Sequence, residues 1–307
     1  MMFSKVLLGL GVAAATIADG LAFTAPLSSK FGVRRMQNVE HTPSCLSFTK
    51  PQSQFGHGRG SLQTLFMGWG PDPIWEDATV VSNDRASESC VSVTLKLSPE
   101  TVEGFKVPGQ YCQVKFSTSE DDKPIFLAVA SPPPATSSEE GSDSQFEFLI
   151  KKTDNNGWIT DTKPGAVLQC SQIMGGGFPM EENFEGFKYD FPTQNVLLFA
   201  AGSGIAPIRS AIESGQLNTK PAGEGGRTAR LYYGVRSTAD MPYKDRFGKW
   251  ELSGVEVVPV ISSPADDYQG RSGYVQTALE EDGVPIPRNS GALMCGMKGM
   301  AEGTFIS

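Results

Sequence analysis

The apolar positions of this 307-residue chain change their spacing near residue 192. Before that point, short runs rich in β-branched and aromatic residues are separated by turn signals. They predict strands over residues 91–97, 110–116, 125–131, 146–152 and 166–173. Regularly spaced short strands are typical of an antiparallel barrel or sandwich. The Pro-, Ser- and acid-rich segment 132–145 is expected to be an exposed loop.

After residue 192, longer apolar runs alternate with amphipathic segments. Strands are predicted over 195–201, 230–235, 255–261 and 292–297, and helices near 208–214, 243–250 and 273–281. Alternating strands and helices indicate a parallel sheet with helices on its faces. The predicted fold is therefore an antiparallel β-barrel (residues 71–185) followed by an α/β parallel-sheet domain of the kind that binds nucleotides (residues 190–307).

The first 70 residues have the composition of targeting segments. Residues 1–22 carry one early lysine and a short apolar core, which is typical of a signal peptide and too short for a membrane span. Residues 23–70 are rich in Ser and Thr and nearly free of acid, as transit peptides are. Phe23 after Ala22 resembles the junction that directs proteins into plastids of secondary origin. A plastid location is predicted, with plain secretion as the alternative, and no membrane span is expected in the mature chain.

Charge and cysteine content narrow the class of protein. Of 26 basic and 34 acidic residues, six basic and two acidic ones lie before residue 71, which leaves a net charge of −12 on the body. An acidic body disfavours nucleic acid as a partner. Five widely spaced cysteines and two histidines form no metal-ligand pattern, so neither a zinc site nor a disulfide framework is predicted.

A glycine-rich turn, GSGIAP (202–207), lies between a predicted strand and a predicted helix. Glycines permit positive φ and close approach of a ligand to the backbone, and Pro207 suits the first turn of a helix. The N-terminus of such a helix attracts phosphate. The third glycine of the Rossmann fingerprint is absent. Taken alone, the turn is compatible with a nucleotide site and with a structural connection.

The other strand ends carry further motifs. YYGVRSTADMPYKDRF (232–247), GRSGYVQTALEE (270–281) and MCGMKGM (294–300) follow GSGIAP in order. Together they resemble the ferredoxin–NADP reductase superfamily, which pairs an FAD-binding barrel with an NAD(P)-binding domain. The resemblance covers about residues 74–303. It is similar in particular to plastid FAD/NAD(P)-binding oxidoreductases of plants and algae without an assigned partner.

The resemblance implies which residues bind the nicotinamide nucleotide. They are Gly202, Ser203, Gly204, Ile205, Ala206, Pro207, Gly234, Val235, Arg236, Ser262, Arg271, Tyr274, Cys295, Gly296 and Met297. Cys295 would help to place the nicotinamide and would not act as a nucleophile; the alternative is a small buried apolar residue. Ser262 and Ser263 stand where NADP-specific members have Ser-Arg, so Arg271 and Tyr274 would replace that arginine. NADP(H) is favoured by the plastid, NAD(H) remains an alternative, and Arg271 is also compatible with a solvated loop charge.

For the flavin, the family motif Arg-x-Tyr-Ser corresponds here to Ala128, Val129, Ala130 and Ser131. Only Ser131 is kept, and losing the guanidinium removes a phosphate contact of roughly 1.5–3 kcal/mol. Ser131 would reach the reactive edge of the flavin and share the catalytic role with Cys295. Gly175, Gly176 and Gly177 resemble a turn that binds the flavin pyrophosphate through backbone N–H groups, or form a flexible interdomain turn. The segment 109–111 is interpreted as structural.

The predicted function is that of an FAD-dependent oxidoreductase. A hydride would pass from NAD(P)H to flavin, and electrons would then pass to an unidentified acceptor in the plastid; an acidic ferredoxin suits the acidic body poorly. The alternative is a redox-inactive nucleotide-binding or interaction module. Ala128, Ala130 and a chain that ends seven residues after the last motif favour that alternative. An unpaired sheet edge beside the strand over 292–297 is expected, since the family's last strand is missing.

Overall fold

A computed structural model describes residues 72–116, 123–134, 144–185, 193–221, 223–297 and 299–300, together with the backbone of strands 11–18 and 21–24. Most of the predicted targeting segments lies outside the described residues. So do residues 301–307 and most of the loop predicted over 132–145. The assignments made for these parts stay predictions.

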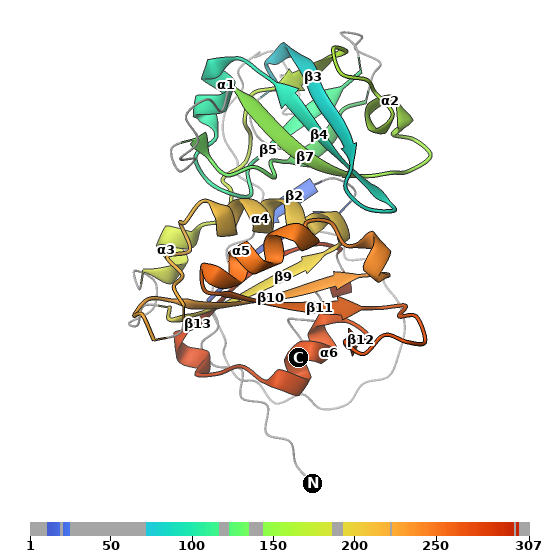
Figure 1. Ribbon diagram of the computed structural model, residues 1–307. Coiled ribbons are helices and arrows are strands. Elements are labelled where there is room, and N and C mark those ends of the chain that lie inside the picture. Colours follow the sequence, from blue (N-terminus) through green and yellow to red (C-terminus); the bar gives the residue numbers. More distant parts are fainter. Residues whose placement is uncertain are drawn as a thin grey trace, which may run out of the picture. The chain divides into compact units, whose positions relative to one another are not determined.

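The first domain is an antiparallel sheet of six strands that curls into a barrel (Figure 1). Its strands are β3 (Trp75–Arg85), β4 (Cys90–Lys96), β5 (Tyr111–Lys115), β6 (Ile125–Ala128), β7 (Gln145–Lys151) and β8 (Val167–Ser171), in the order β6-β5-β8-β3-β4-β7. Beyond β6, the N–H of Ala130 donates to the carbonyl of Glu147 in β7 at 2.8 Å. This bond joins the two edge strands, so the barrel is nearly closed.

The five strands predicted for this half are confirmed with small shifts. β3 was not predicted as a separate strand, because only Ala78 and Val80 are buried in its largely polar sequence. β6 ends three residues before the predicted end, since the chain leaves β5 there and crosses toward β7. Three short helices connect the strands. They are α1 (Pro99–Gly104), α2 (Gly157–Thr160) and α3 (Met180–Phe184).

The second domain is a parallel sheet with helices on both faces (Figure 1). Its strands are β9 (Asn195–Ala201), β10 (Thr228–Val235), β11 (Val255–Ile261), the short β12 (Arg271–Ser272) and β13 (Ser290–Cys295). Helices α4 (Ile205–Glu213) and α5 (Phe247–Leu252) cover one face, and α6 (Val275–Asp282) covers the other. All four predicted strands and all three predicted helices are present, with shifted ends. The helix predicted over 243–250 begins with a 3₁₀ turn.

Side chains of the central strands alternate strictly between the two faces. Leu198 and Ala200 pack with α4, while Leu197 and Phe199 pack with α6. Strands buried on both faces appear in the sequence as continuous apolar runs, which is why this half was easy to predict. The same alternation turns Cys295 toward the α4 face.

In the structure the edge of β13 is paired, by residues that the sequence analysis assigns to the signal peptide, so the open edge expected of the mature chain stays a prediction. β1 (Gly11–Ala18) pairs with β13 in parallel, and β2 (Leu21–Thr24) pairs with β1 in antiparallel orientation. An exposed row of backbone N–H and C=O groups readily accepts another strand, and β1 satisfies it here.

Among the described residues, no helix is long and apolar enough to span a membrane.

Candidate functional site

The carboxyl ends of β9, β10, β11 and β13 meet at one edge of the parallel sheet, here called the nucleotide edge. Gly234 of β10 pairs with Ala201 of β9 on one side and with Val260 of β11 on the other. Cys295 of β13 pairs with Ala200 of β9. The fold therefore brings together the four motifs that the sequence spreads over about a hundred residues. Ligands of open α/β sheets bind at this kind of edge.

The turn after β9 lies directly against the end of β13. A Cβ placed on Gly204 would lie 2.3 Å from the carbonyl oxygen of Cys295 and 3.0 Å from the nitrogen of Gly296. No side chain can be accommodated there, because the atoms that it would meet belong to the backbone. Gly204 is therefore required by close approach. This contact connects the first motif of the nucleotide edge to the last.

The turn itself has an accessible half and a buried half. Gly202 and Ser203 are partly exposed, and Gly202 has a positive φ of 54° with open space where a Cβ would be. Gly204 and the first three residues of α4 are buried. No side chain caps the N-terminus of α4. A 3₁₀ turn over Gly202–Gly204 extends this end of the helix, and the Ile205 N–H already donates to the carbonyls of Gly202 and Ser203. The partly exposed backbone at Gly202 and Ser203, at the positive end of the helix dipole, thus suits an anion, and Pro207, at the third helical position, fits the first turn.

Gly234 lets α6 approach the nucleotide edge. A Cβ on Gly234 would lie 3.0 Å from Val275 Cγ1 in the first turn of α6. Tyr274, which directly precedes Val275 and α6, is 62% exposed. Arg236, just past β10, is exposed, and its carbonyl accepts a hydrogen bond from the N–H of Ser263 at 2.9 Å. Among the described residues, the Arg236 guanidinium has no ion-pair partner, so it can reach a ligand at this edge.

The Arg271 guanidinium forms its hydrogen bonds with helix α6 and not with the loop after β11. Its guanidinium donates to an Asp282 carboxylate oxygen and to the Ala278 carbonyl, the latter at 3.1 Å. Asp282 also accepts from the Tyr232 hydroxyl at 2.8 Å. The Asp282 bond raises the pKa of Arg271, so its charge is kept. Tyr274 thus remains exposed at the nucleotide edge, whereas Arg271 is held by an internal carboxylate.

The end of β13 contributes one buried and one exposed side chain. Cys295 is fully buried against the α4 face, whereas Met297 is 68% exposed. Between them, a Cβ on Gly296 would lie 2.8 Å from Ala201 Cβ, so this glycine lets β13 and β9 approach. Cys295 accordingly has the burial expected of the alternative role, a small apolar residue. Among the described residues, no group of His, Cys, Asp or Glu side chains could hold a metal ion.

The strand that carries the predicted flavin motif presents its outer face next to a tyrosine. Leu127 and Val129 point into the barrel core, which leaves Ala128 on the outer face. Tyr111 of β5 pairs with Ala128 across the strands, so their side chains share that face. The Tyr111 ring contacts Phe126 at 5.7 Å between centroids. We call these three residues, Tyr111, Phe126 and Ala128, the flavin face.

The glycine turn lies beside the flavin face. A Cβ on Gly175 would lie 2.7 Å from the Tyr111 ring, and one on Gly177 would lie 2.7 Å from the Pro108 carbonyl. Both have positive φ, whereas Gly176 between them is exposed and faces open space. A cavity of about 460 Å³ adjoins Gly176. It is lined by Val107, Gly176, Phe178, Pro179, Met180, Glu181 and Gln216. The turn is therefore a fixed structure with one open backbone position.

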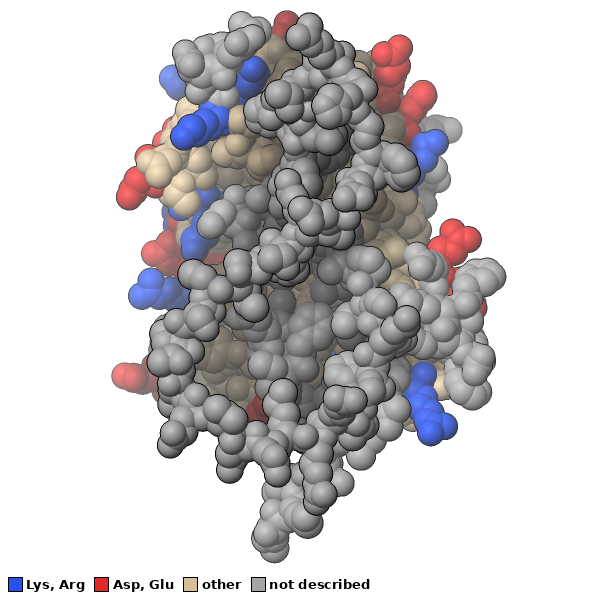
Figure 2. Space-filling view, turned by 180° about the vertical axis from the view of Figure 1, so that it is seen from behind, with Lys and Arg blue, Asp and Glu red and all other residues tan. Residues whose placement is uncertain are grey.

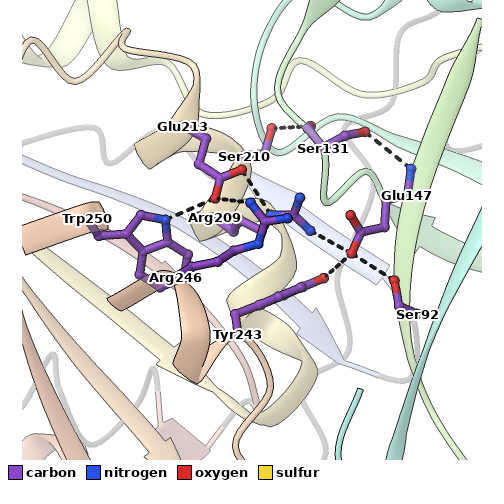
Figure 3. Close-up of polar contacts among 9 residues, drawn as sticks. All are labelled: Ser92, Ser131, Glu147, Arg209, Ser210, Glu213, Tyr243, Arg246 and Trp250. Atoms are coloured by element: carbon purple, nitrogen blue, oxygen red, sulfur yellow. Dashed lines mark hydrogen bonds and ion pairs between the residues drawn. The ribbon is translucent and has the colours of Figure 1, made fainter. Parts of the chain in front are cut away.

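Ser131 lies where the barrel meets α4 (Figure 3). Its hydroxyl accepts from the N–H of Glu147 at 3.2 Å, and its carbonyl accepts from the Ser210 hydroxyl at 2.9 Å. Glu147 forms an ion pair with Arg209 at 2.6 Å. Burial by itself would raise the pKa of the Glu147 carboxyl, but Arg209 and the hydrogen bonds of Ser92 and Tyr243 hold it below its usual value. The ion pair is therefore complete at neutral pH and is lost only as the pH falls below the ordinary range of a glutamate.

Three residues near the two sites were not predicted from the sequence to be functional. Tyr111 was interpreted as structural, and Glu147 and Arg209 were not considered. A signal existed for Arg209, because an arginine paired with Glu213 at i+4 interrupts an otherwise apolar helix. None existed for Tyr111 or Glu147, since their neighbours come from other strands.

Comparisons with known proteins agree with this architecture. The oxidoreductase NAD-binding domain family matches residues 198–305. The fruit protein pKIWI502 of Actinidia deliciosa is 34% identical over 242 residues, which cover 77% of this chain and 71% of that protein. The chloroplastic ferredoxin–NADP reductase leaf isozyme 1 of Oryza sativa subsp. indica is 26% identical over 163 residues, covering 50% of this chain and 42% of that enzyme. A ferredoxin NADP+ reductase from Neisseria gonorrhoeae, solved with FAD and NADP, has a TM-score of 0.61 at 16% identity, covering 76% of this chain and 89% of that one.

A nearly closed antiparallel barrel followed by a parallel sheet with a nucleotide edge defines a two-domain oxidoreductase fold. The chain belongs to the ferredoxin–NADP reductase superfamily, a class of NAD(P)H-dependent flavin oxidoreductases. The resemblance seen in the sequence motifs is confirmed. The chain spans less than half the length of the rice enzyme.

Proposed function

We propose that this protein transfers reducing equivalents from NADPH through FAD to an acceptor in the plastid. The observation that carries the proposal is the contact of Gly204 with Cys295 and Gly296, which unites the motifs at the nucleotide edge. The partly exposed turn at Gly202 and Ser203, just before α4, would bind the nucleotide pyrophosphate. Flavin, when bound, supplies the redox chemistry, and the protein supplies binding and orientation.

The flavin face and the glycine turn fit FAD in a manner that differs from the family motif. Ala128 and Ala130 offer neither a guanidinium nor a ring. Tyr111 lies on the same face as Ala128, and among the described residues its hydroxyl has no hydrogen-bond partner. We propose that this phenol donates to the flavin and that the open backbone at Gly176 binds its pyrophosphate. Ser131 would lie beside the transferred hydride, and the buried Cys295 would support the backbone at that place.

The visible spectrum of the purified protein tests the proposal. After incubation with FAD and gel filtration, the protein should be yellow, and anaerobic NADPH should bleach its flavin bands. The matched control is the same protein incubated with NADP+, which carries no hydride to transfer. A colourless protein that takes up no added FAD would instead support the redox-inactive nucleotide-binding or interaction module.

Nucleotide preference should depend on Arg236. We propose that the exposed Arg236 guanidinium binds the 2′-phosphate of NADPH. Arg236→Ala is therefore expected to raise the KM for NADPH by about tenfold or more, because a hydrogen bond to a charged group contributes roughly 1.5–3 kcal/mol. The KM for NADH should change little, since NADH lacks the 2′-phosphate. Arg271→Met is the matched comparison, because its guanidinium is held by Asp282. Steady-state kinetics with both nucleotides measures the ratio. A larger loss of NADPH preference in Arg271→Met than in Arg236→Ala contradicts this assignment.

Flavin affinity should depend on the hydroxyl of Tyr111. Tyr111→Phe keeps the ring over Gly175 but removes the donor, so the FAD dissociation constant should rise by about tenfold, equivalent to roughly 1.4 kcal/mol. Fluorescence titration of the apoprotein with FAD measures it. Tyr268→Phe, which removes a hydroxyl in the loop after β11 of the other domain, far along the chain from the flavin face, is the control and should leave the constant unchanged. Equal constants for Tyr111→Phe and wild type show that this phenol does not bind flavin.

The plastid location and the acceptor belong to the same proposal. The signal-like and transit-like segments of residues 1–70 support the location, as do relatives named chloroplastic, such as the rice reductase. Basic and acidic side chains both lie around the margins of the face in Figure 2, so the described part of that face carries no single sign of charge. The net charge of −12 after residue 70 disfavours an acidic protein as the acceptor.

A further inference from the structure

Helix α4 binds the barrel through two consecutive side chains (Figure 3). Arg209, which is 3% exposed, forms its ion pair with Glu147 of β7, and Ser210 donates to the carbonyl of Ser131. The same helix begins at Gly204 of the nucleotide turn. One helix of nine residues therefore follows directly on the proposed pyrophosphate turn at Gly202 and Ser203 and carries a barrel contact in its second turn. We call the contacts of Arg209 and Ser210 with Glu147 and Ser131 the domain clamp.

The clamp is held from several directions, so its geometry is fixed. Arg209 Nε donates to Glu213 at 3.1 Å, and the guanidinium lies 4.6 Å from the centre of the Tyr243 ring. The Glu147 oxygen that binds Arg209 also accepts from the hydroxyls of Ser92, at 2.8 Å, and Tyr243, at 3.1 Å. Each charged group in the clamp thus has more than one partner.

The Glu213 carboxylate, on the other side of Arg209, also has several hydrogen-bond partners. One Glu213 oxygen accepts from Arg246 at 3.1 Å and from the Trp250 indole N–H at 3.0 Å. Glu213 therefore holds the clamp arginine and α5 together. Desolvation offsets much of the electrostatic attraction in a buried ion pair, so the pair adds little to the free energy of unfolding. We assign it the other role, which is to hold its partners in one defined arrangement. The clamp accordingly has the properties of a device that fixes geometry.

We infer that Arg209 is a positioning residue for hydride transfer: with Ser210, it sets the nucleotide turn at a fixed distance from Ser131 of the barrel. This inference rests on the proposed function, because it requires a flavin on the barrel and a nicotinamide at the nucleotide edge. Arg209 touches neither group and acts through the placement of α4. A displacement of about 1 Å between reacting groups lowers a rate by about 10²-fold.

The test separates rate from binding. Glu147→Gln removes the charge but keeps a side chain that Ser92 and Tyr243 can still reach, and Arg209→Lys keeps the charge but loses the fork. Each should lower the rate of flavin reduction at saturating NADPH, measured by stopped flow, by about 10- to 100-fold. The dissociation constants for FAD and NADP+ should change by less than about threefold, because the residues that bind those groups are intact. The double variant should lose no more than the worse single variant, since both act through one contact.

Control variants and alternative outcomes complete the design. Lys152→Met breaks an exposed barrel ion pair of 2.7 Å and should leave the rate unchanged. Ser210→Ala removes only the bond to Ser131, so it tests the inference even if Arg209→Lys does not fold. If wild type binds FAD and is reduced but Glu147→Gln and Ser210→Ala keep its rate, positioning is overturned while the proposed function stands. A rate loss matched by an equal loss of NADP+ affinity also overturns positioning. A wild type that takes up no FAD overturns both.

Discussion

Gly204→Ala is expected to destabilise the protein severely and to abolish nucleotide binding. The new Cβ would lie 2.3 Å from the Cys295 carbonyl oxygen, and neither partner can rotate away because both are backbone. Overpacking in a closed site costs typically 1–3 kcal/mol and more where the neighbours cannot move. We expect about 3 kcal/mol or more, which lowers the Tm of a domain of this size by roughly 6–12 °C. Relief of the clash would separate the α4 turn from Gly296, so the folded fraction should also lose NADP+ affinity.

Thermal unfolding followed by circular dichroism and titration with NADP+ measure the two effects. Gly248→Ala is the matched control, because this glycine lies in α5 with no atom within 4 Å of the new Cβ. Alanine is favoured over glycine in a helix by up to about 1 kcal/mol, so the control should be neutral or stabilising. Equal Tm values for the two variants would show that β9 and β13 do not need the close contact.

Arg227→Met is expected to cause the other large loss of stability. Arg227 precedes β10 and is buried. Its guanidinium donates to the backbone carbonyls of Thr193, Leu217 and Phe184, at 2.9, 3.3 and 3.1 Å, and pairs with Glu185 at 2.6 Å. It thereby ties the end of the barrel domain, near α3, to the start of the sheet. Methionine fills a similar volume but leaves buried acceptors unpaired, each at roughly 1–3 kcal/mol. We expect a loss of about 3 kcal/mol or more in the free energy of unfolding.

Urea unfolding of the variant and of Arg230→Met measures this expectation. Arg230 lies three residues later, is 34% exposed, and pairs with Glu256 at 2.8 Å and with Asp282 at 3.3 Å. Asp282 keeps Arg271 and the Tyr232 hydroxyl as partners when Arg230 is replaced, and the exposed pair with Glu256 contributes about 0–1 kcal/mol. The surface variant should therefore unfold close to wild type, and the buried one at clearly lower urea. Similar midpoints for both variants contradict the structural role assigned to Arg227.

The parallel sheet could be predicted because its strands are buried on both faces, so that runs such as Val196–Ala200 are apolar throughout. β3 was not predicted as a separate strand for the opposite reason, since only one of its faces is apolar and its ends are polar. The strand ends with glycine motifs were also found in advance. Their contact is decided by register, which pairs Ala200 with Cys295 across 95 positions of sequence.

Assignments that depended on side-chain partners were the least predictable. Arg271 seemed available for a phosphate, yet it folds back on Asp282, which lies in the next helix. Arg236, which directly follows β10, is exposed instead. Tyr111 became a candidate flavin residue only because β5 places it opposite Ala128. Which charge meets which partner depends on distances that sequence spacing does not contain.

The sequence by itself determined the order of the two domains, the strand–turn–helix at Gly202–Pro207 and the family, because periodicity and glycine spacing are local properties. The tertiary structure decided that Gly204 must remain glycine, that Arg209 and Glu147 join helix α4 to the barrel, and that Tyr111 lies beside the alanines of the flavin motif. These are contacts between residues far apart in the chain. They are fixed by strand register and core packing, since the free energy of a buried contact depends on the neighbours that the fold supplies.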